Sequence, residues 1–144
     1  MGNLSPYLTA IILAWAMAQG GKFLVASVRQ WGTLDVRQLY QSGNMPSAHT
    51  ATVIALMTVV GLIDGIESNV FAIATLLATI VMYDAVMVRR SSGEQGAAIH
   101  ALIRERKSAI GLPRTAKGHE PLEVAVGAII GLAVGVFVFF ITHS

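Results

Sequence analysis

A histidine and a glutamate four residues apart are the first candidates for chemistry in this chain. His119 and Glu123 stack on one face of an expected helix, and Gly118 and Pro121 mark its start. A carboxylate in this position can fix the tautomer of the imidazole and raise its nucleophilicity. Taken alone, the pair fits a simple polar contact equally well.

A second histidine follows a loop that leads into another expected helix. In the segment Ser42-Gly43-Asn44-Met45-Pro46-Ser47-Ala48-His49, Pro46 suits a first helical turn. Ser47 and His49 lie where backbone N–H groups are still free, and such a helix start can bind an anion. His49 could then protonate a leaving oxygen. The alternative is an ordinary helix cap.

Three further groups carry charge near apolar segments. Lys22 and Arg29 are seven residues apart, so both project from one helical face and could clamp one anion. The alternative is that both extend to the membrane surface as anchors. Asp84 lies about one helical turn inside an apolar segment, where burial of a charge is costly, so we expect an arginine, Arg89 or Arg90, to pair with it.

The elements that must position these groups are membrane helices. The chain is 54% hydrophobic and 12% charged, which excludes an ordinary soluble domain. It has no cysteine, which excludes disulfides and thiolate metal sites. We expect an all-α integral membrane bundle of one domain, with a short interfacial helix within 93–107 and four transmembrane spans over residues 6–28, 46–63, 70–88 and 122–141.

The charge distribution predicts how the bundle is oriented. All ten Lys and Arg residues fall at or beyond one membrane edge, in or next to the polar segments 29–45 and 89–121. The positive-inside rule places these segments in the cytoplasm and both termini on the opposite side. We expect a bacterial-type plasma membrane or an organelle inner membrane, and no nucleic-acid partner. All the candidate groups then meet at the cytoplasmic face.

Gly127, Gly131 and Gly135 recur every four residues in the last span. Such a stripe lets another helix approach closely. It predicts helix packing, and a homodimer formed through this stripe is one form that packing could take.

In combination, these segments resemble the three motifs of the type 2 phosphatidic acid phosphatases and the vanadium-dependent haloperoxidases. Lys22 and Arg29 match the first motif in spacing, with Gln30 where that family has Pro. The segment Pro46-Ser47-Ala48-His49 resembles the second, with Ala in place of Gly. His119 with Glu123 resembles the third, with Glu in place of Asp. The whole chain is similar to a divergent branch described as acid phosphatase or vanadium-dependent haloperoxidase-related proteins.

The third motif also contains an arginine, and its position here is open. Arg114 stands five residues before His119, where that family has six. Arg89 and Arg90 are the alternatives for this phosphate contact. Four spans are also fewer than the usual six.

The resemblance implies a metal-independent lipid phosphate phosphatase that needs no cofactor. His119 would attack phosphorus, Glu123 would orient it, and His49 would protonate the departing alcohol. Asp84 would belong to the same catalytic group. The phosphate would be bound by Lys22, Arg29, Ser47 and an arginine from Arg89, Arg90 and Arg114. The expected partner is a membrane lipid, with phosphatidylglycerophosphate the first choice of substrate and phosphatidate or a polyprenyl phosphate next.

Two other functions are compatible with the residues. One is a non-enzymatic membrane scaffold or transporter subunit, in which the charges form structural ion pairs. The other is haloperoxidase chemistry with bound vanadate, which a cytoplasmic, lipid-embedded site suits less well than phosphoester hydrolysis. The chain contains no P-loop, no dinucleotide-binding glycine motif and no HExxH zinc motif.

Overall fold

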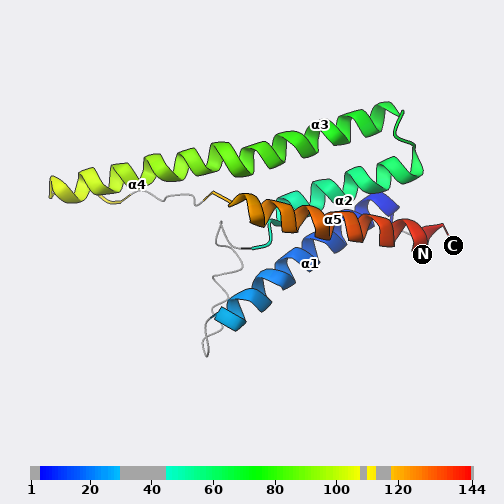
Figure 1. Cartoon of the computed structure of the whole chain (residues 1–144), viewed down its shortest axis with the longest axis horizontal. Helices are drawn as coiled ribbons and strands as arrows, with labels where there is room; N and C mark the ends of the chain where they lie inside the picture. The colour runs from blue at the N-terminus through cyan, green and yellow to red at the C-terminus, as the bar shows by residue number, and fades with distance from the viewer. Residues whose placement is uncertain (1–3, 30–44, 108–109, 113–117, 144) are drawn as a thin grey trace.

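The computed structural model describes residues 4–29, 45–107, 110–112 and 118–143. They form an all-helical structure, as expected, whose order is α1 (Pro6–Arg29), α2 (Ala48–Ile63), α3 (Asn69–Tyr83), a π-helical turn η2 (Asp84–Val88), α4 (Arg89–Glu105) and α5 (Pro121–Thr142). Helices α1, α2, α3 and α5 lie together in a bundle (Figure 1). Helices α1, α2 and α5 begin and end within two residues of the predicted apolar segments, whereas α3 ends at Tyr83 and the backbone stays helical through η2 and α4.

Three helical stretches in the described part of the chain are long and apolar enough to cross a membrane: Pro6–Val25, Asn69–Glu105 and Pro121–Thr142. Helix α2 has 16 residues, which at 1.5 Å per residue gives about 24 Å, less than the hydrocarbon core of about 30 Å. The membrane location therefore has structural support. The fourth span stays a prediction.

The ends of the helices are set by local residues. Ser47 caps α2, where its Oγ accepts a hydrogen bond from the backbone N–H of Thr50. Ser68 caps α3 in the same way and accepts from the N–H of Phe71 at 3.1 Å. Between these helices, Gly65 has a φ of +86°, a conformation that glycine adopts without strain. The connection is a tight turn, and the start of α1 and the end of α5 lie at the same end of the bundle as this turn (Figure 1).

Small residues allow the helices to pack closely around α2. Helix α2 contacts α1, α3 and α5, so it is the central helix of the bundle. On α1 the buried positions recur every four residues as alanine, which presents a flat face to α2. The buried core consists of Ala10, Ala14, Ala18, Ala48, Ala51, Ala55, Val59, Val134 and Val138.

The glycine stripe of α5 packs against α2 of the same chain. A Cβ placed on Gly127 would lie 2.5 Å from the carbonyl oxygen of Ser47. A Cβ on Gly131 would lie 2.4 Å from the carbonyl oxygen of Ala51, and Gly135 is equally tight against Thr58. The prediction of close helix packing is therefore confirmed. The stripe is covered by α2 of the same chain, and a homodimer stays a prediction.

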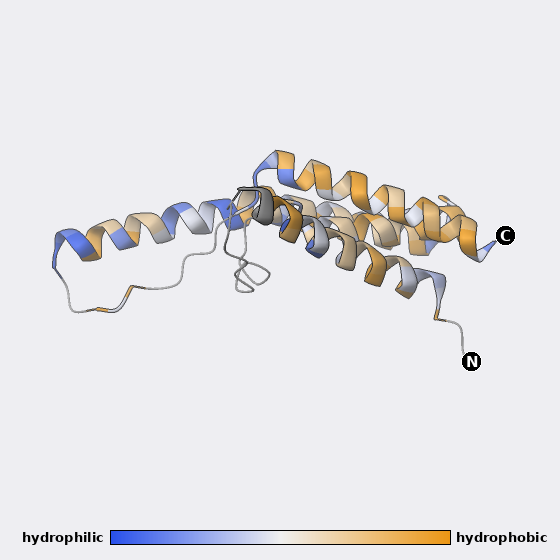
Figure 2. Ribbon diagram, turned by 90° about the horizontal axis from the view of Figure 1, so that it is seen from below, coloured by the Kyte–Doolittle hydropathy of each residue, from blue (hydrophilic) through white to orange (hydrophobic). Residues whose placement is uncertain are grey.

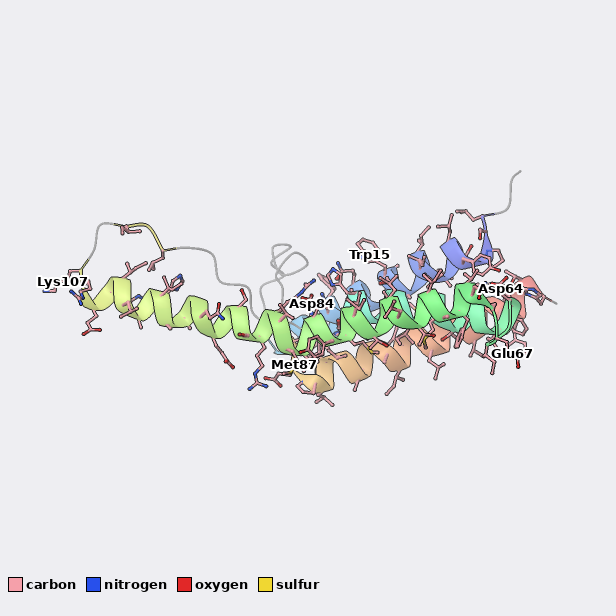
Figure 3. The ribbon with its side chains drawn as sticks, turned by 90° about the horizontal axis from the view of Figure 1, so that it is seen from above. Trp15, Asp64, Glu67, Asp84, Met87 and Lys107 are labelled. Carbon is pink, nitrogen blue, oxygen red and sulfur yellow. The ribbon has the colours of Figure 1, made fainter. Side chains whose placement is uncertain are left out.

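Helix α4 lies where the sequence predicts a short interfacial helix, and its placement relative to a membrane stays a prediction. It runs from Arg89 to Glu105 and continues directly from α3 through η2 instead of lying across the end of the bundle (Figures 1 and 2). The backbone stays helical at the junction, where Arg89 has φ −68° and ψ −33°, so α4 extends α3 without a break. Figure 3 shows Lys107 at the far end of this extension, well separated from Asp84. No residue of α4 is buried.

Candidate active site

His119 and Glu123 form the predicted pair at the start of α5. Nδ1 of His119 lies 2.8 Å from Oε2 of Glu123, and the imidazole is buried, with 3% of the side chain exposed. The same Oε2 accepts a hydrogen bond from the backbone N–H of Glu120 at 3.1 Å. Glu120 and Glu123 together form a capping box. Glu123 therefore holds the imidazole and the helix start with one carboxylate.

The hydrogen bond to Glu123 sets the chemistry of the His119 ring. A carboxylate can only accept, so Nδ1 carries the proton when the imidazole is neutral. The lone pair is then on Nε2. This is the arrangement that a nucleophilic histidine needs.

The residues before α5 are fixed against two other elements. The backbone N–H of His119 donates to the carbonyl oxygen of Ala85 in η2 at 3.1 Å. Gly118 lies so close to η2 and α4 that a Cβ would be 2.5 Å from the backbone nitrogen of Arg90. On the other side, the N–H of Ser47 donates to the carbonyl oxygen of Glu123 at 3.1 Å. The starts of α2 and α5 and the end of α3 therefore meet at one point.

His49 and the predicted cations gather at this same end of the bundle. His49 is the second residue of α2 and is exposed, in contrast to His119. Four groups are close enough for their charges to act on its imidazole: Arg89, Lys22, His119 and Asp84. Lys22, from α1, is also within electrostatic range of Glu123. Four elements thus contribute ionisable groups to one region.

The expected partner of Asp84 is Arg89. Nε of Arg89 lies 2.7 Å from Oδ2 of Asp84, and both side chains are about one third exposed. Arg90 instead pairs with Glu94 at 3.3 Å on an open face of α4, where both side chains are mostly exposed. Of the two neighbouring arginines, Arg89 is the one whose charge reaches His49.

Ser47 is fully buried and has the structural role that the sequence left open as an alternative. Its Oγ accepts from the hydroxyl of Thr50 at 3.0 Å and from the N–H of Thr50 at 3.4 Å. Two other predicted phosphate ligands fall outside the description: Arg29 ends α1 but its side chain is not described, and Arg114 lies outside the described residues. Among the described residues, no three His, Asp or Glu side chains are placed to hold a metal ion.

Comparison with known proteins shows the family of this chain. A family model described as "Divergent PAP2 family" matches residues 4–134. The chain belongs to this family. The uncharacterized membrane protein YuiD of Bacillus subtilis (strain 168) is similar to it, with 34% identity over 140 residues that cover 87% of this chain and 85% of that protein. No solved structure matches the chain significantly.

Membership of the divergent PAP2 family confirms the resemblance drawn from the three motifs. The matched range includes the histidines of the second and third motifs and both residues of the first. With the similarity to YuiD and the long apolar helices, it identifies the chain as a PAP2-related membrane protein.

Two features of this region were not predicted from the sequence. One is η2, the π-helical turn, because an extra residue in a helix leaves no mark in an apolar pattern. The other is the hydrogen bond from the N–H of His119 to Ala85, which involves only backbone atoms. Gly118 was the available signal for the second, since glycine often marks a close approach between backbones.

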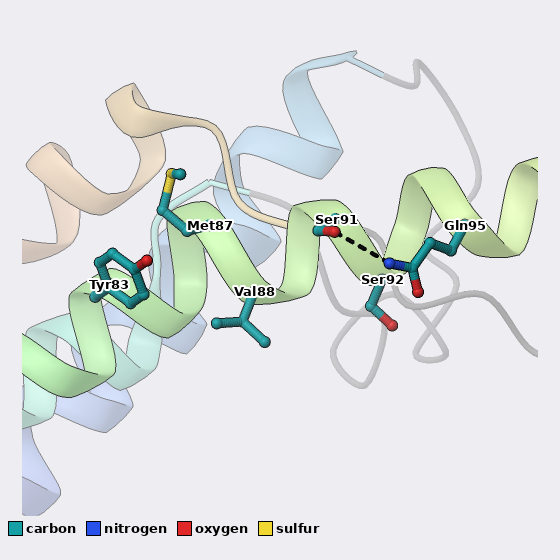
Figure 4. A pocket seen from close by; sticks show the side chains of 6 residues that line it. All are labelled: Tyr83, Met87, Val88, Ser91, Ser92 and Gln95. Atoms are coloured by element: carbon teal, nitrogen blue, oxygen red, sulfur yellow. Dashed lines mark hydrogen bonds between the residues drawn. The ribbon is translucent and has the colours of Figure 1, made fainter.

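A surface hollow of about 430 Å³ lies on the outer face of the α3–α4 helix. It is lined by Tyr83, Met87, Val88, Ser91, Ser92 and Gln95, and a weak hydrogen bond joins Gln95 to Ser91 at 3.3 Å (Figure 4). None of the predicted site residues lines it. The hollow is open to the surroundings, so we assign it no part in the chemistry.

Proposed function

We propose that this protein is a membrane lipid phosphate phosphatase that works through a phosphohistidine intermediate. The observation that carries the proposal is the buried His119–Glu123 pair, at 2.8 Å, in a region that also holds His49, Lys22 and Arg89. Its membership of a family related to lipid phosphatases supports the same chemistry.

The residues have distinct roles in the proposed reaction. Nε2 of His119 attacks phosphorus while Glu123 stabilises the positive charge that develops on the ring. The bond from phosphorus to the leaving oxygen breaks, and that oxygen takes a proton from protonated His49. Water then attacks the phosphohistidine and gives a proton to His49, and the P–N bond breaks to release inorganic phosphate. Both histidines return to their starting states.

Cations stabilise the negative charge that the phosphoryl oxygens carry in the transition state. Lys22 and Arg89 are the described cations whose charges reach the site. Asp84 contributes by holding Arg89 in place. Arg29 and Arg114 are further proposed ligands, whereas Arg90 is engaged by Glu94 and is the weakest of the candidates.

The proposed substrate is a lipid whose phosphate lies at the headgroup level and whose tails stay in the bilayer. All ten basic residues lie at or beyond one edge of the apolar segments, so we place the site at the cytoplasmic face. Lipid phosphates of biosynthesis are made on that face. Phosphatidylglycerophosphate is the first substrate to test, followed by phosphatidate and polyprenyl phosphate.

The test is phosphate release by the purified protein in detergent micelles from each of these three lipids, with and without a chelator. We expect release from at least one lipid, and the same rate when divalent cations are removed. Inorganic vanadate should inhibit, since it resembles the phosphorane. Absence of release from every lipid phosphate would favour a scaffold or transporter subunit. Loss of activity with chelator would show that a metal ion takes part.

Replacement of Lys22 by methionine should weaken substrate binding. A hydrogen bond to a charged group contributes about 1.5–3 kcal/mol, so we expect KM to rise by about 10- to 100-fold. The control is Arg104→Met, which removes a charge from the last turn of α4, outside the bundle. Steady-state kinetics on both variants measures the effect. Equal KM values for Lys22→Met and the wild-type protein would exclude Lys22 from the phosphate site.

A further inference from the structure

The π-helical turn η2 changes the hydrogen bonding of one helix carbonyl. In an α-helix the N–H of Arg89 would donate to the carbonyl oxygen of Ala85, four residues back. Here it donates to the carbonyl oxygen of Asp84, five residues back. The carbonyl of Ala85 is thereby released from its usual α-helical partner, although its residue is buried, with 3% exposed.

The released carbonyl is used by the proposed nucleophile. Ala85 accepts a hydrogen bond from the N–H of His119 at 3.1 Å. A buried backbone N–H group needs a hydrogen-bond acceptor. In the interior of a regular α-helix each backbone carbonyl already accepts a hydrogen bond within the helix, so none is free for another segment. Gly118, the preceding residue, packs against the backbone of Arg90, one residue beyond η2 and its capping Arg89. Two consecutive residues before α5 are therefore held by the same short stretch of helix.

The turn also determines which arginine meets Asp84. Residues five apart on an α-helix point about 140° away from each other and cannot pair. In η2 the wider turn brings Asp84 and Arg89 together, with Nε and Oδ2 at 2.7 Å. The π-helical turn η2 thus orients both Arg89, a candidate phosphate ligand, and the segment that carries His119.

We propose that η2 is the positioning element of the active site, which holds His119 through the carbonyl of Ala85. This inference rests on the proposed function for its effect on catalysis, but the contact itself can be measured independently. A π-turn is a single extra residue in an α-helix, so removal of one residue should restore regular α-helix and keep the register on both sides. The turn can therefore be removed without rearrangement of α3 or α4.

The test is deletion of Met87, whose side chain is exposed. In the resulting α-helix, Ala85 accepts from the N–H of Arg90, which is then four residues further on, and His119 loses its acceptor. Asp84 and Arg89 become four residues apart and can still pair. We therefore expect kcat to fall by about 100-fold, the effect of a displacement of about 1 Å, with little change in KM.

Hydrogen exchange gives a readout that does not depend on activity. The chain has four histidines, so protein labelled with [15N]histidine gives few amide signals, and the one from His119 can be assigned by substitution. Deletion of Met87 should speed exchange at His119 by at least about tenfold. The control is deletion of Ala98, in the part of α4 outside the bundle, which should leave both exchange and kcat unchanged.

A second variant covers the case in which the Met87 deletion does not fold. Gly118→Ala places a Cβ against the backbone of Arg90, which must push the segment away from η2. We expect faster exchange at His119 and a kcat lowered by about tenfold. Unchanged exchange at His119 in the folded variants, or faster exchange without loss of kcat, would overturn the inference. If the wild-type protein releases no phosphate, the proposed function fails, and exchange at His119 still decides whether η2 holds this segment.

Discussion

His119→Ala should abolish phosphate release, with kcat lowered by more than about 10⁴-fold. Loss of the nucleophile in a hydrolase typically costs several orders of magnitude in kcat. The imidazole of His119 is buried beside Glu123, so we expect that no water molecule occupies its position in the variant and attacks phosphorus directly. Rapid quenching of a reaction with a radiolabelled lipid phosphate should trap an acid-labile, alkali-stable label on the wild-type chain and none on the variant.

The control for this experiment is His143→Ala. His143 lies just beyond α5 at the other end of the bundle, where it stacks on Phe139. We expect normal kcat and normal labelling from this variant. Phosphate release from His119→Ala at more than a few per cent of the wild-type rate would exclude the phosphohistidine mechanism. Labelling that persists in His119→Ala would move the nucleophile to another residue, with His49 the first to test.

The substitution Glu123→Gln separates the two roles proposed for Glu123, which are to orient the His119 ring and to stabilise its positive charge during attack. Glutamine can still accept a hydrogen bond from Nδ1 of His119, but it cannot stabilise the positive charge that the ring gains as Nε2 attacks. We expect kcat to fall by about 10²- to 10⁴-fold, the usual range for loss of such a group, with a smaller change in KM. Stopped-flow measurement of the labelling step would show whether formation of the phosphohistidine is the slowed step.

The sequence was sufficient to predict the helices because lipid imposes a simple rule on composition. Long apolar segments must be helical when no water can satisfy their backbone groups, and their bounds follow from the charges that flank them. The His119–Glu123 contact could be predicted for a related reason, since residues four apart on a helix always share a face. Both inferences depend only on local geometry.

Contacts that depend on an irregular backbone could not be predicted in this way. Regular helical spacing gives no reason to pair Asp84 with Arg89, because five residues is the wrong interval for an α-helix. The choice among the arginines therefore stayed open until η2 was seen. The amphipathic pattern of residues 93–107 likewise predicts a helix, but it does not show that this helix continues from α3 through η2.

The helix contact made by the glycine stripe could be predicted only in part. Its four-residue spacing predicts a close helix contact, but a sequence does not say which helix makes it. The structure shows that α2 fills the stripe along three turns of α5, with backbone atoms of α2 directly against it. Since α2 also carries Ser47 and His49, this contact fixes the distance between the two halves of the site. Packing in the bundle and geometry at the site are therefore linked.

Gly131→Ala should destabilise the bundle strongly for so small a change. The added methyl group would lie 2.4 Å from the carbonyl oxygen of Ala51, and a backbone atom cannot rotate away as a side chain can. Overpacking of this kind costs about 1–3 kcal/mol. For a chain of this length we expect Tm to fall by roughly 4–12 °C, which thermal unfolding of the detergent-solubilised protein would measure.

The matched control is the same substitution at Gly20, in the interior of α1. A Cβ at Gly20 meets no atom within 4 Å, and alanine is favoured over glycine within a helix by about 1 kcal/mol. Gly20→Ala should therefore leave Tm unchanged or raise it slightly. Equal Tm values for the two variants would show that α2 and α5 are not in close contact at Gly131. The coupling of α2 to α5, and with it the shared placement of His49 and His119, would then have to be abandoned.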